Sequence, residues 1–404
     1  MKFSEFCKFQ EGYVNPSQKK SEYFDGNIKW LRATDLNNAN VYTTSRMLTE
    51  VGFKSAGKSA LLFEPNTIAI SKSGTIGRVG ILKDYMCGNR AVINIKVDEN
   101  LVNLKYLFYW LINNNKYIQD LAVGSVQKNL YVSILSELEI EDINIEEQKK
   151  IADILSSLDN KIELNNDMNK TLEEMAQSIF KRWFVDFEFP NKDGEPYKSS
   201  GGEMVDSELG MIPKGWEVKS LDKIADFLNG LAMQKFRPKE DELEFLPVLK
   251  IKELKQGSTS KDSDRCSCNI DSKYIIDDGD IIFAWSGSLD VRVWCGGKAG
   301  LNQHLFKVTS KDYPKWFYYL WVKRYLDDFI RIAADRATTM GHIKRSNLTE
   351  AKVLIPDNNT LCNMEKKIGY LVDLFIEKSI ESKELGEIRD TLLPKLMSGE
   401  IKLT

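Results

Sequence analysis

A phosphate-binding loop has the pattern G-x-x-x-x-G-K-[ST], and the chain matches it at Gly52-Phe53-Lys54-Ser55-Ala56-Gly57-Lys58-Ser59. Such a loop binds phosphates only between a buried strand and a helix, because backbone N–H groups and the helix N-terminus must face the ligand. The preceding residues 42–50 are mostly polar, and only five residues separate Ser59 from Pro65. We therefore interpret the match as accidental, although a nucleotide-binding enzyme built on Gly52–Ser59 stays an alternative hypothesis.

The histidines and cysteines do not form a recognisable catalytic or metal-binding set. Both histidines, His304 and His342, lie in the second half of the chain, and the six cysteines include no C-x-x-C pair, so the ligand spacing of a zinc site is missing. No carboxylate cluster suggests a metal-dependent nuclease. We therefore assign no catalytic residues, no cofactor-binding residues and no metal ligands, and predict a binding protein that is not an enzyme.

Polar and basic residues gather in short loops that occur twice along the chain. In the first half the candidate DNA-binding residues are Lys72, Ser73, Thr75, Arg78, Asn89, Arg90, Ser125, Gln127, Lys128 and Asn129. In the second half they are Trp285, Ser286, Ser288, Arg292, Gln303, His304, Thr338, Thr339, His342, Lys344 and Arg345. Lysine and arginine can neutralise phosphates, while arginine, asparagine, glutamine and hydroxyl side chains can read base edges. The alternative is that these residues only form turns and solvated charges.

Composition limits where such a surface can lie. The chain has 404 residues, 56 Lys and Arg against 59 Asp and Glu, and a net charge of −3, so a site for a polyanion must be local. The length predicts two or three domains at about 150 residues each. The longest apolar runs have about five residues, against the ~20 of a membrane-spanning helix. Dispersed cysteines without a secretion signal favour a reducing cytoplasm.

The elements that carry these loops are predicted to occur in duplicate. Residues 3–12 match 221–230, with apolar residues three apart and a final glycine, at an offset of 218. Further matches follow in the same order, at offsets of 211 to 218: 31–36 with 249–254, 70–75 with 283–288, 106–110 with 317–321, 124–137 with 337–350, and 149–151 with 366–368. An unchanged order indicates a tandem duplication; the alternative is chance similarity between amphipathic segments.

Each copy is predicted to contain a mixed α/β module. Strands are expected at 67–71, 78–83 and 91–97 in the first copy and at 281–285, 291–294 and 305–308 in the second. A helical apolar stripe runs from Leu104 to Leu121, and the second copy has a helix near 316–332.

A long helix is predicted to follow each module. Apolar residues alternate at spacings of three and four at Ile151, Leu155, Leu158, Ile162, Leu172, Ala176, Ile179 and Trp183, with Asn165 and Asn169 in the middle of the seam. The second copy has Ile368, Val372, Phe375, Leu385, Ile388, Leu392 and Leu396, with Ser379 and Ser382 at its polar centre. We predict an antiparallel coiled-coil pair, about 60 Å long at ~1.5 Å per residue, which separates the two modules. The alternative is that each helix packs on its own module as ordinary core.

The whole chain resembles the specificity subunit of type I DNA restriction–modification systems. The resemblance rests on the duplicated layout, on residues 208–217 (ELGMIPKGWE), on residues 338–343 (TTMGHI) and on residues 145–151 (IEEQKKI), which introduce the first long helix. One departure is that the first module has no counterpart of Ile212–Trp216. That edge is either trimmed or completed by the C-terminal residues 398–401.

The resemblance implies an α/β (mixed α+β) fold with two target recognition domains, two long antiparallel helices and a pseudo-twofold internal repeat. It further implies a sequence-specific subunit that reads a split target in double-stranded DNA and docks two methyltransferase subunits, in a complex that recruits an endonuclease and translocase subunit. S-adenosylmethionine, ATP and Mg²⁺ would then be used by those partners, with no membrane involved. A coiled-coil scaffold that never touches DNA is the remaining alternative.

The predicted boundaries follow from these elements. They place the first recognition domain at 1–145, the first long helix at 146–189, a linker rich in Pro, Gly and Ser at 190–215, the second recognition domain at 216–360 and the second long helix at 361–404.

Overall fold

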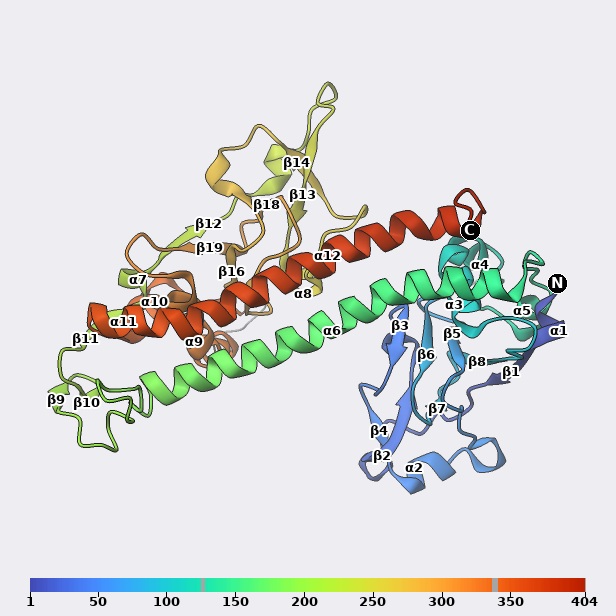
Figure 1. The fold of residues 1–404 in the computed structure, drawn as a ribbon, viewed down its shortest axis with the longest axis horizontal. Helices are drawn as coiled ribbons and strands as arrows, with labels where there is room; N and C mark the ends of the chain where they lie inside the picture. Colours follow the sequence, from blue (N-terminus) through green and yellow to red (C-terminus); the bar gives the residue numbers. More distant parts are fainter. Residues whose placement is uncertain (125–127, 336–340, 404) are drawn as a thin grey trace. The chain divides into compact units, whose positions relative to one another are not determined.

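The computed structural model describes residues 1–124, 128–335 and 341–403 (Figure 1). They divide into a first unit, formed by Met1–Lys161 with the chain from Leu385 onward, and a second unit, Ile162–Glu384. Both long helices are cut by this division, so each helix contributes one part to each unit. None of the described helices combines the length and the apolar character needed to cross a membrane.

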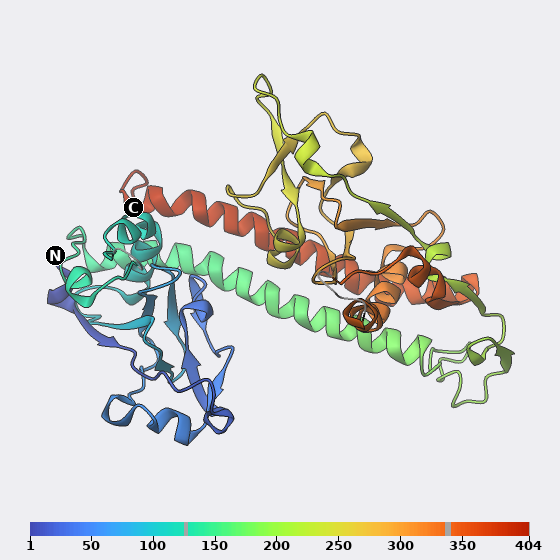
Figure 2. The same cartoon turned by 180° about the vertical axis from the view of Figure 1, so that it is seen from behind.

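The first unit, whose N-terminal part is blue to teal in Figure 2, is built on a five-stranded sheet of order β1-β8-β5-β6-β3. Its strands are β1 (Cys7–Glu11), β3 (Ala39–Val41), β5 (Ile68–Ser71), β6 (Val79–Leu82) and β8 (Val92–Val97). A second sheet of order β4-β2-β7 contains β2 (Phe24–Leu31), β4 (Met47–Leu48) and β7 (Cys87–Gly88). The helices are α1 (Phe3–Phe6), α2 (Glu50–Lys54), α3 (Leu104–Asn113), α4 (Asn115–Asp120), α5 (Val132–Ser136) and the start of α6 (Ile145–Phe184).

The second unit repeats this plan. Its main sheet has the order β12-β19-β16-β17, with β12 (Asp226–Asn229), β16 (Ile281–Ala284), β17 (Asp290–Val293) and β19 (Leu305–Thr309). A second sheet of order β14-β13-β18-β15 contains β13 (Phe245–Leu249), β14 (Arg265–Ser267), β15 (Ile275–Ile276) and β18 (Ala299–Leu301). The pairs β9 (Met204–Ser207) with β10 (Gly210–Pro213) and β11 (Glu217–Ser220) with β20 (Lys352–Ile355) complete its strands. Its helices are α7 (Leu221–Ile224), α8 (Ile251–Gln256), α9 (Lys315–Asp335), α10 (Arg345–Glu350), α11 (Asn358–Met364) and α12 (Tyr370–Met397), which extends into the first unit.

The central strand of each main sheet is buried on both faces, as its uninterrupted apolar sequence predicts. In β5, Ile68 and Ile70 pack into the cluster that contains α3 residues, while Ala69 packs on the opposite side. In β16, Phe283 faces the cluster with α9 residues and Ile282 faces the other.

The duplication predicted from the sequence is confirmed by matched backbone hydrogen bonds in the two units. Gly12 N donates to Val92 O at 2.9 Å, and Gly230 N donates to Leu305 O at 3.0 Å. Similarly, Asn89 N donates to Leu31 O at 2.9 Å and its counterpart Asn302 N to Leu249 O at 3.2 Å. The strand order of the shared four strands is also the same, so the two modules have one topology.

Two local predictions need correction. The stripe from Leu104 to Leu121 forms two helices rather than one, because Asn114 leaves helical geometry (φ −96°, ψ 15°) and its Nδ2 donates to Trp110 O at 2.9 Å. Ile388, assigned to the helix seam, is 48% exposed. The seam runs instead through Arg389, whose Nη1 donates to Asp159 Oδ1 at 2.6 Å, and then through Leu393 and Leu396, both buried.

The long helices pair with each other and also supply core residues to both units. The predicted coiled coil and its alternative, packing of the helices on the modules as ordinary core, therefore both occur. In the first unit, Ile151 and Leu155 of α6 and Leu393 and Leu396 of α12 belong to the main hydrophobic cluster. In the second unit, the main hydrophobic cluster contains Ala176, Phe180 and Trp183 of α6 and Val372 of α12.

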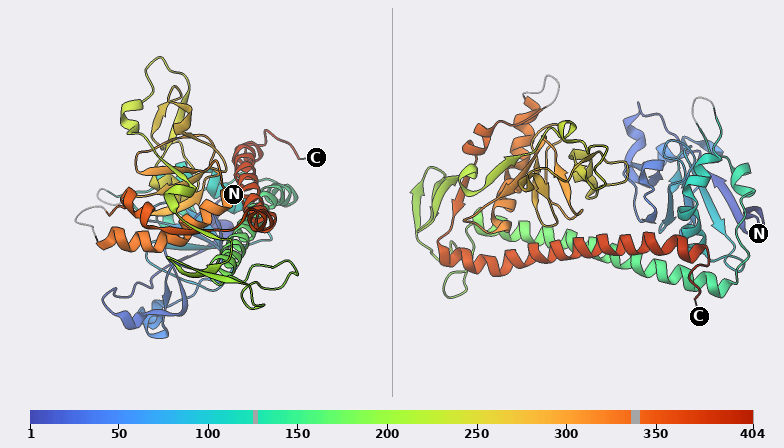
Figure 3. Two further views of the ribbon diagram at one scale, coloured as in Figure 1. Left: turned by 90° about the vertical axis from the view of Figure 1, so that its left-hand side faces the viewer. Right: turned by 90° about the horizontal axis from the view of Figure 1, so that it is seen from above.

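The polar centre of the seam lies in the second unit, where parts of α6 and α12 run antiparallel (Figure 3). Asn165 Nδ2 donates to Glu381 Oε2 at 3.1 Å, and Asn169 Nδ2 donates to Ser379 Oγ at 2.9 Å. The Oδ1 atoms of both asparagines are buried, and no hydrogen-bond donor reaches them among the described residues. These buried acceptors weaken the seam but favour one register of the helices.

The N-terminal edge of the first module is formed by residues 1–3, which pair with residues 138–140. Phe3 N donates to Leu138 O at 2.8 Å, and Lys2 pairs with Glu139 in the place where β11 pairs with β20 in the second unit. Ile401 and Leu403 pack against the same core. The C-terminal residues therefore contribute to the core of the first unit, and their role in completing this edge stays a prediction.

Replacing either matched glycine by alanine should destabilise its unit. A Cβ atom at Gly12 would lie 2.1 Å from Asn89 O, and one at Gly230 would lie 2.3 Å from Asn302 O. Because the backbone must shift, we expect Gly12→Ala and Gly230→Ala each to lower the free energy of unfolding by about 1–3 kcal/mol. Chemical denaturation measures this. Gly386→Ala is the control, since nothing lies within 4 Å of its Cβ and alanine favours helix; an equal loss there would contradict the explanation.

Replacing the polar seam residue Asn169 by leucine should stabilise the second unit. The change removes Asn169 Oδ1, a buried acceptor that receives no hydrogen bond from the described residues. Ser379 Oγ keeps its hydrogen bond to Phe375 O at 2.8 Å. We expect Asn169→Leu to raise the free energy of unfolding by about 1 kcal/mol, whereas the exposed Asn166→Leu on the same helix should change it little. A fall in stability for Asn169→Leu would mean that the asparagine amide is fully satisfied.

Candidate nucleic-acid interface

One end of each main sheet gathers the loops that the sequence singles out. Because β1 and β5 are both antiparallel to β8, the ends of β1 and β5 lie beside the start of β8. The second unit repeats the arrangement with the ends of β12 and β16 beside the start of β19. In the first module, the loop after β5 therefore lies beside the loop before β8. In the second module, the loop after β16 lies beside the loop before β19.

The backbone of Lys72 joins three loop segments of the first module, and we call this position the junction. Its N donates to Ala91 O at 2.7 Å, and its O accepts from Leu130 N at 2.9 Å. Three segments far apart in the sequence thus meet here. The predicted residues Thr75, Arg78, Arg90 and Lys128 are exposed, and Ser73, Asn89 and Asn129 are half-buried. Ser125 and Gln127 lie outside the described residues.

Trp285 is the same junction in the second module. Its N donates to His304 O at 3.3 Å, and its O accepts from Ile343 N at 3.2 Å. Ser286 pairs with His342 through a backbone bridge, and its hydroxyl is 2.9 Å from His304 Nδ1. Gln303 is half-buried and Lys344 is exposed. Thr338 and Thr339 lie outside the described residues.

Some of the predicted side chains make contacts within their own module. Asn89 Oδ1 accepts from Ala91 N at 3.0 Å. Arg292 Nε donates to Asp290 Oδ2 at 2.8 Å, and the Ser288 hydroxyl accepts from Lys255 Nζ. Arg345 Nη2 donates to Phe227 O at 3.0 Å, with its guanidinium 5.4 Å from the Phe306 ring centroid. These contacts hold the loops in place, and the DNA-binding role of the residues stays a prediction.

Sequence reasoning missed two residues at this sheet end, Glu11 and Asn229. Lys72 Nζ donates to Glu11 Oε1 at 2.8 Å, and the Tyr13 hydroxyl donates to Glu11 Oε2 at 2.7 Å. The hydrogen bond from Lys72 is the main reason why the pKa of Glu11 is lowered, so its carboxylate stays ionised at neutral pH. In the second module, Trp285 Nε1 donates to Asn229 Oδ1 at 3.0 Å. The available signal was their place directly before the matched glycines Gly12 and Gly230.

The apparent phosphate-binding loop does not have the required local structure. Gly52 lies inside the five-residue helix α2, and its N donates to the capping Thr49 Oγ1 at 3.2 Å. A short 3-10 turn at Gly57–Ser59 follows in place of a helix. The backbone N–H groups are therefore not arranged around a phosphate at the N-terminus of a helix.

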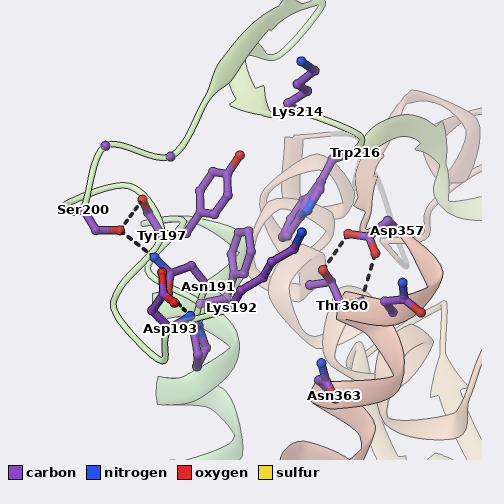
Figure 4. A pocket seen from close by; sticks show the side chains of 15 residues that line it. Asn191, Lys192, Asp193, Tyr197, Ser200, Lys214, Trp216, Asp357, Thr360 and Asn363 are labelled. Atoms are coloured by element: carbon purple, nitrogen blue, oxygen red, sulfur yellow. Dashed lines mark hydrogen bonds between the residues drawn. The ribbon is translucent and has the colours of Figure 1, made fainter.

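A cavity of about 510 Å³ lies in the second unit, between the segment after α6 and the start of α11 (Figure 4). Phe189 stacks between Tyr197 and Trp216, with ring centroids 4.6 and 5.0 Å away. Asn191 Nδ2 donates to Ser200 Oγ at 3.1 Å, which closes the segment on itself. This stack anchors the residues predicted as a linker to the core of the second unit. Elsewhere in the described residues, no cluster of three or more His, Cys, Asp or Glu side chains is arranged to hold a metal ion.

Comparison with known proteins identifies the family. The sequence model described as "Type I restriction modification DNA specificity domain" matches residues 1–174 and 213–389, one copy in each half. The "Type I restriction enzyme MjaIX specificity subunit" of Methanocaldococcus jannaschii is 30% identical over 97% of this chain and 91% of its own length. The "Type I restriction enzyme HindI specificity subunit" of Haemophilus influenzae is 26% identical over 79% of this chain and 82% of its own length.

A solved structure has the same fold. The crystal structure of the type I restriction-modification S subunit from M. genitalium superposes with a TM-score of 0.54 at 17% identity, covering 98% of this chain and 95% of that one. The family model matches both modules, and the relative from M. jannaschii spans 97% of the sequence. The chain therefore belongs to the family of type I restriction–modification DNA specificity subunits, which recognise DNA and are not themselves catalytic.

Proposed function

We propose that this chain reads a split DNA sequence, with one module bound to each half. The observation that carries the proposal is the loop junction built twice, at Lys72 and at Trp285, from the same backbone hydrogen bonds. Each junction brings cations to one sheet end, among them the exposed Arg90 in the first module and Lys344 in the second. Cations fix a protein on the phosphates, while polar side chains between them can read base edges.

The long helices are proposed to set the number of base pairs between the two half-sites. Support comes from α6, which is continuous from Ile145 to Phe184 and supplies core residues to each unit. The paired asparagines in the seam favour one register between α6 and α12. A helix pair in a single register is suited to act as a ruler along DNA.

The complex that uses this reader is proposed to contain the catalytic parts. We expect two methyltransferase subunits docked on the long helices and an endonuclease and translocase subunit recruited to them. S-adenosylmethionine, ATP and Mg²⁺ would bind to those subunits, and the complex would act in the cytoplasm on chromosomal or incoming DNA. The relatives' names as restriction-enzyme specificity subunits support such an assembly.

Removing one exposed cation in each module tests whether the modules read separate halves. We expect Arg90→Ala to weaken backbone protection over one half-site and Lys344→Ala over the other, each lowering the slope of log K against log[salt] by about one. Footprinting and salt-titrated binding of the assembled complex measure this. Lys96→Ala is the control, because Lys96 pairs with Glu64 at the opposite end of the sheet. Equal loss over both halves would contradict two separate readers.

Lengthening the paired helices tests the ruler. We would insert four residues after Asn165 and four after Glu381, which are hydrogen-bonded partners, so that the seam stays paired. The insertion adds roughly 6 Å of helix, and the preferred spacer should change by one or two base pairs. Genomic methylation mapping reports the spacer directly. Four residues inserted within 191–195, outside the helices, should leave it unchanged; an unchanged spacer after the helix insertion would refute the ruler.

A further inference from the structure

We propose that Glu11 with Lys72 and Asn229 with Trp285 form one equivalent position in the two modules, which selects a C·G base pair in one half-site and an A·T base pair in the other. This inference rests on the proposed function and goes further, because it assigns a base preference to named side chains.

The two pairs are equivalent by their backbone. Glu11 and Asn229 end β1 and β12, and each precedes a glycine that approaches the strand opposite. Lys72 and Trp285 occupy the matched junctions, with the same two backbone hydrogen bonds. In each module, the junction side chain donates to the side chain at the strand end, at 2.8 and 3.0 Å. The backbone is therefore common, and the side-chain chemistry is what differs.

In the first module the pair presents an acceptor and a cation. Both Glu11 oxygens already accept one hydrogen bond, but a carboxylate has about four acceptor sites, so room remains for another donor. Glu11 and Lys72 are 23% and 16% exposed, which leaves them within reach of a ligand at the sheet end. A carboxylate accepts from cytosine N4, and a lysine donates to guanine O6 and N7. Together they match the two bases of a C·G pair.

In the second module the pair presents an amide and an aromatic ring. Asn229 is exposed, and the hydrogen bond from Trp285 Nε1 orients its Oδ1 towards the indole. An amide oriented in this way can donate through Nδ2 to adenine N7 and accept from N6 through the second lone pair of Oδ1. Trp285 stacks on Phe306 at 5.5 Å, which fixes an apolar ring beside the amide. Apolar contact favours the methyl group of thymine.

Two isosteric substitutions test the assignment in opposite directions. Glu11→Gln turns a carboxylate into an amide, and Asn229→Asp turns an amide into a carboxylate. In the chain assembled with its modification subunits, we expect Glu11→Gln to move the preference at one position of one half-site from cytosine towards adenine. Asn229→Asp should move the preference at one position of the other half-site from adenine towards cytosine. Each shift should be about ten-fold or more.

The readout is binding and methylation of duplex DNA in which every base is varied across the mapped wild-type target. Glu64→Gln is the matched control, because Glu64 pairs with Lys96 at 2.5 Å but lies away from the junction loops. It should leave all preferences unchanged. Unfolding curves that match wild-type show that each variant is folded.

The outcomes separate the inference from the proposed function. If the wild-type complex reads a split target but both variants weaken all bases equally, or change nothing, the pairs only hold the loops and the inference is wrong. If wild-type itself reads no split target, the proposed function fails as well. A base-specific shift confined to one half-site for each variant would establish the assignment.

Discussion

Burial of one apolar seam on α6 and α12 is the constraint on which the rest of the protein depends. Within each unit, a part of α6 and a part of α12 complete the module's hydrophobic core, through Leu155 and Leu393 in the first and through Trp183 and Val372 in the second. If either helix separated from a unit, it would expose large apolar side chains. Burial of each such side chain stabilises the folded state by about 1.5–3 kcal/mol. The parts of α6 and α12 are consequently held in each unit by its hydrophobic core rather than by surface contacts alone.

The protein separates the task of building a loop junction from the task of choosing a ligand. Backbone hydrogen bonds at Lys72 and Trp285 are the same in both modules, and glycines 12 and 230 pack closely against matched backbone atoms, Asn89 O and Asn302 O. Since backbone groups carry no sequence preference, the side chains at the junction are free to differ. An ion pair occupies the site in one module and an amide with an indole in the other. One fold therefore presents two different side-chain chemistries at the same position.

Much of the fold could be predicted from the sequence, because repeats and the spacing of apolar residues can be recognised without knowing which residues are in contact. The duplication, the buried strands β5 and β16 and the helix seam all follow from periodicity. The prediction that Ile388 lies in the seam is wrong, because apolar spacing alone cannot indicate that the neighbouring Arg389 occupies the seam through its ion pair with Asp159. Glu11 and Asn229 were missed because only the strand pairing brings them to Lys72 and Trp285. Likewise, nothing in the sequence indicated that Arg345 is drawn to a backbone carbonyl of its own module.

The division of the chain between the units has a consequence for its synthesis. The second unit is contiguous, from Ile162 to Glu384, whereas the first needs Leu393 and Leu396 from the last helix. Domains usually fold in the order in which they leave the ribosome. The apolar surface around Ile151 and Leu155 can be covered by Leu393 and Leu396 only after the second unit has been synthesised, because these two residues follow it in the sequence. We therefore expect the core of the first unit to be completed last.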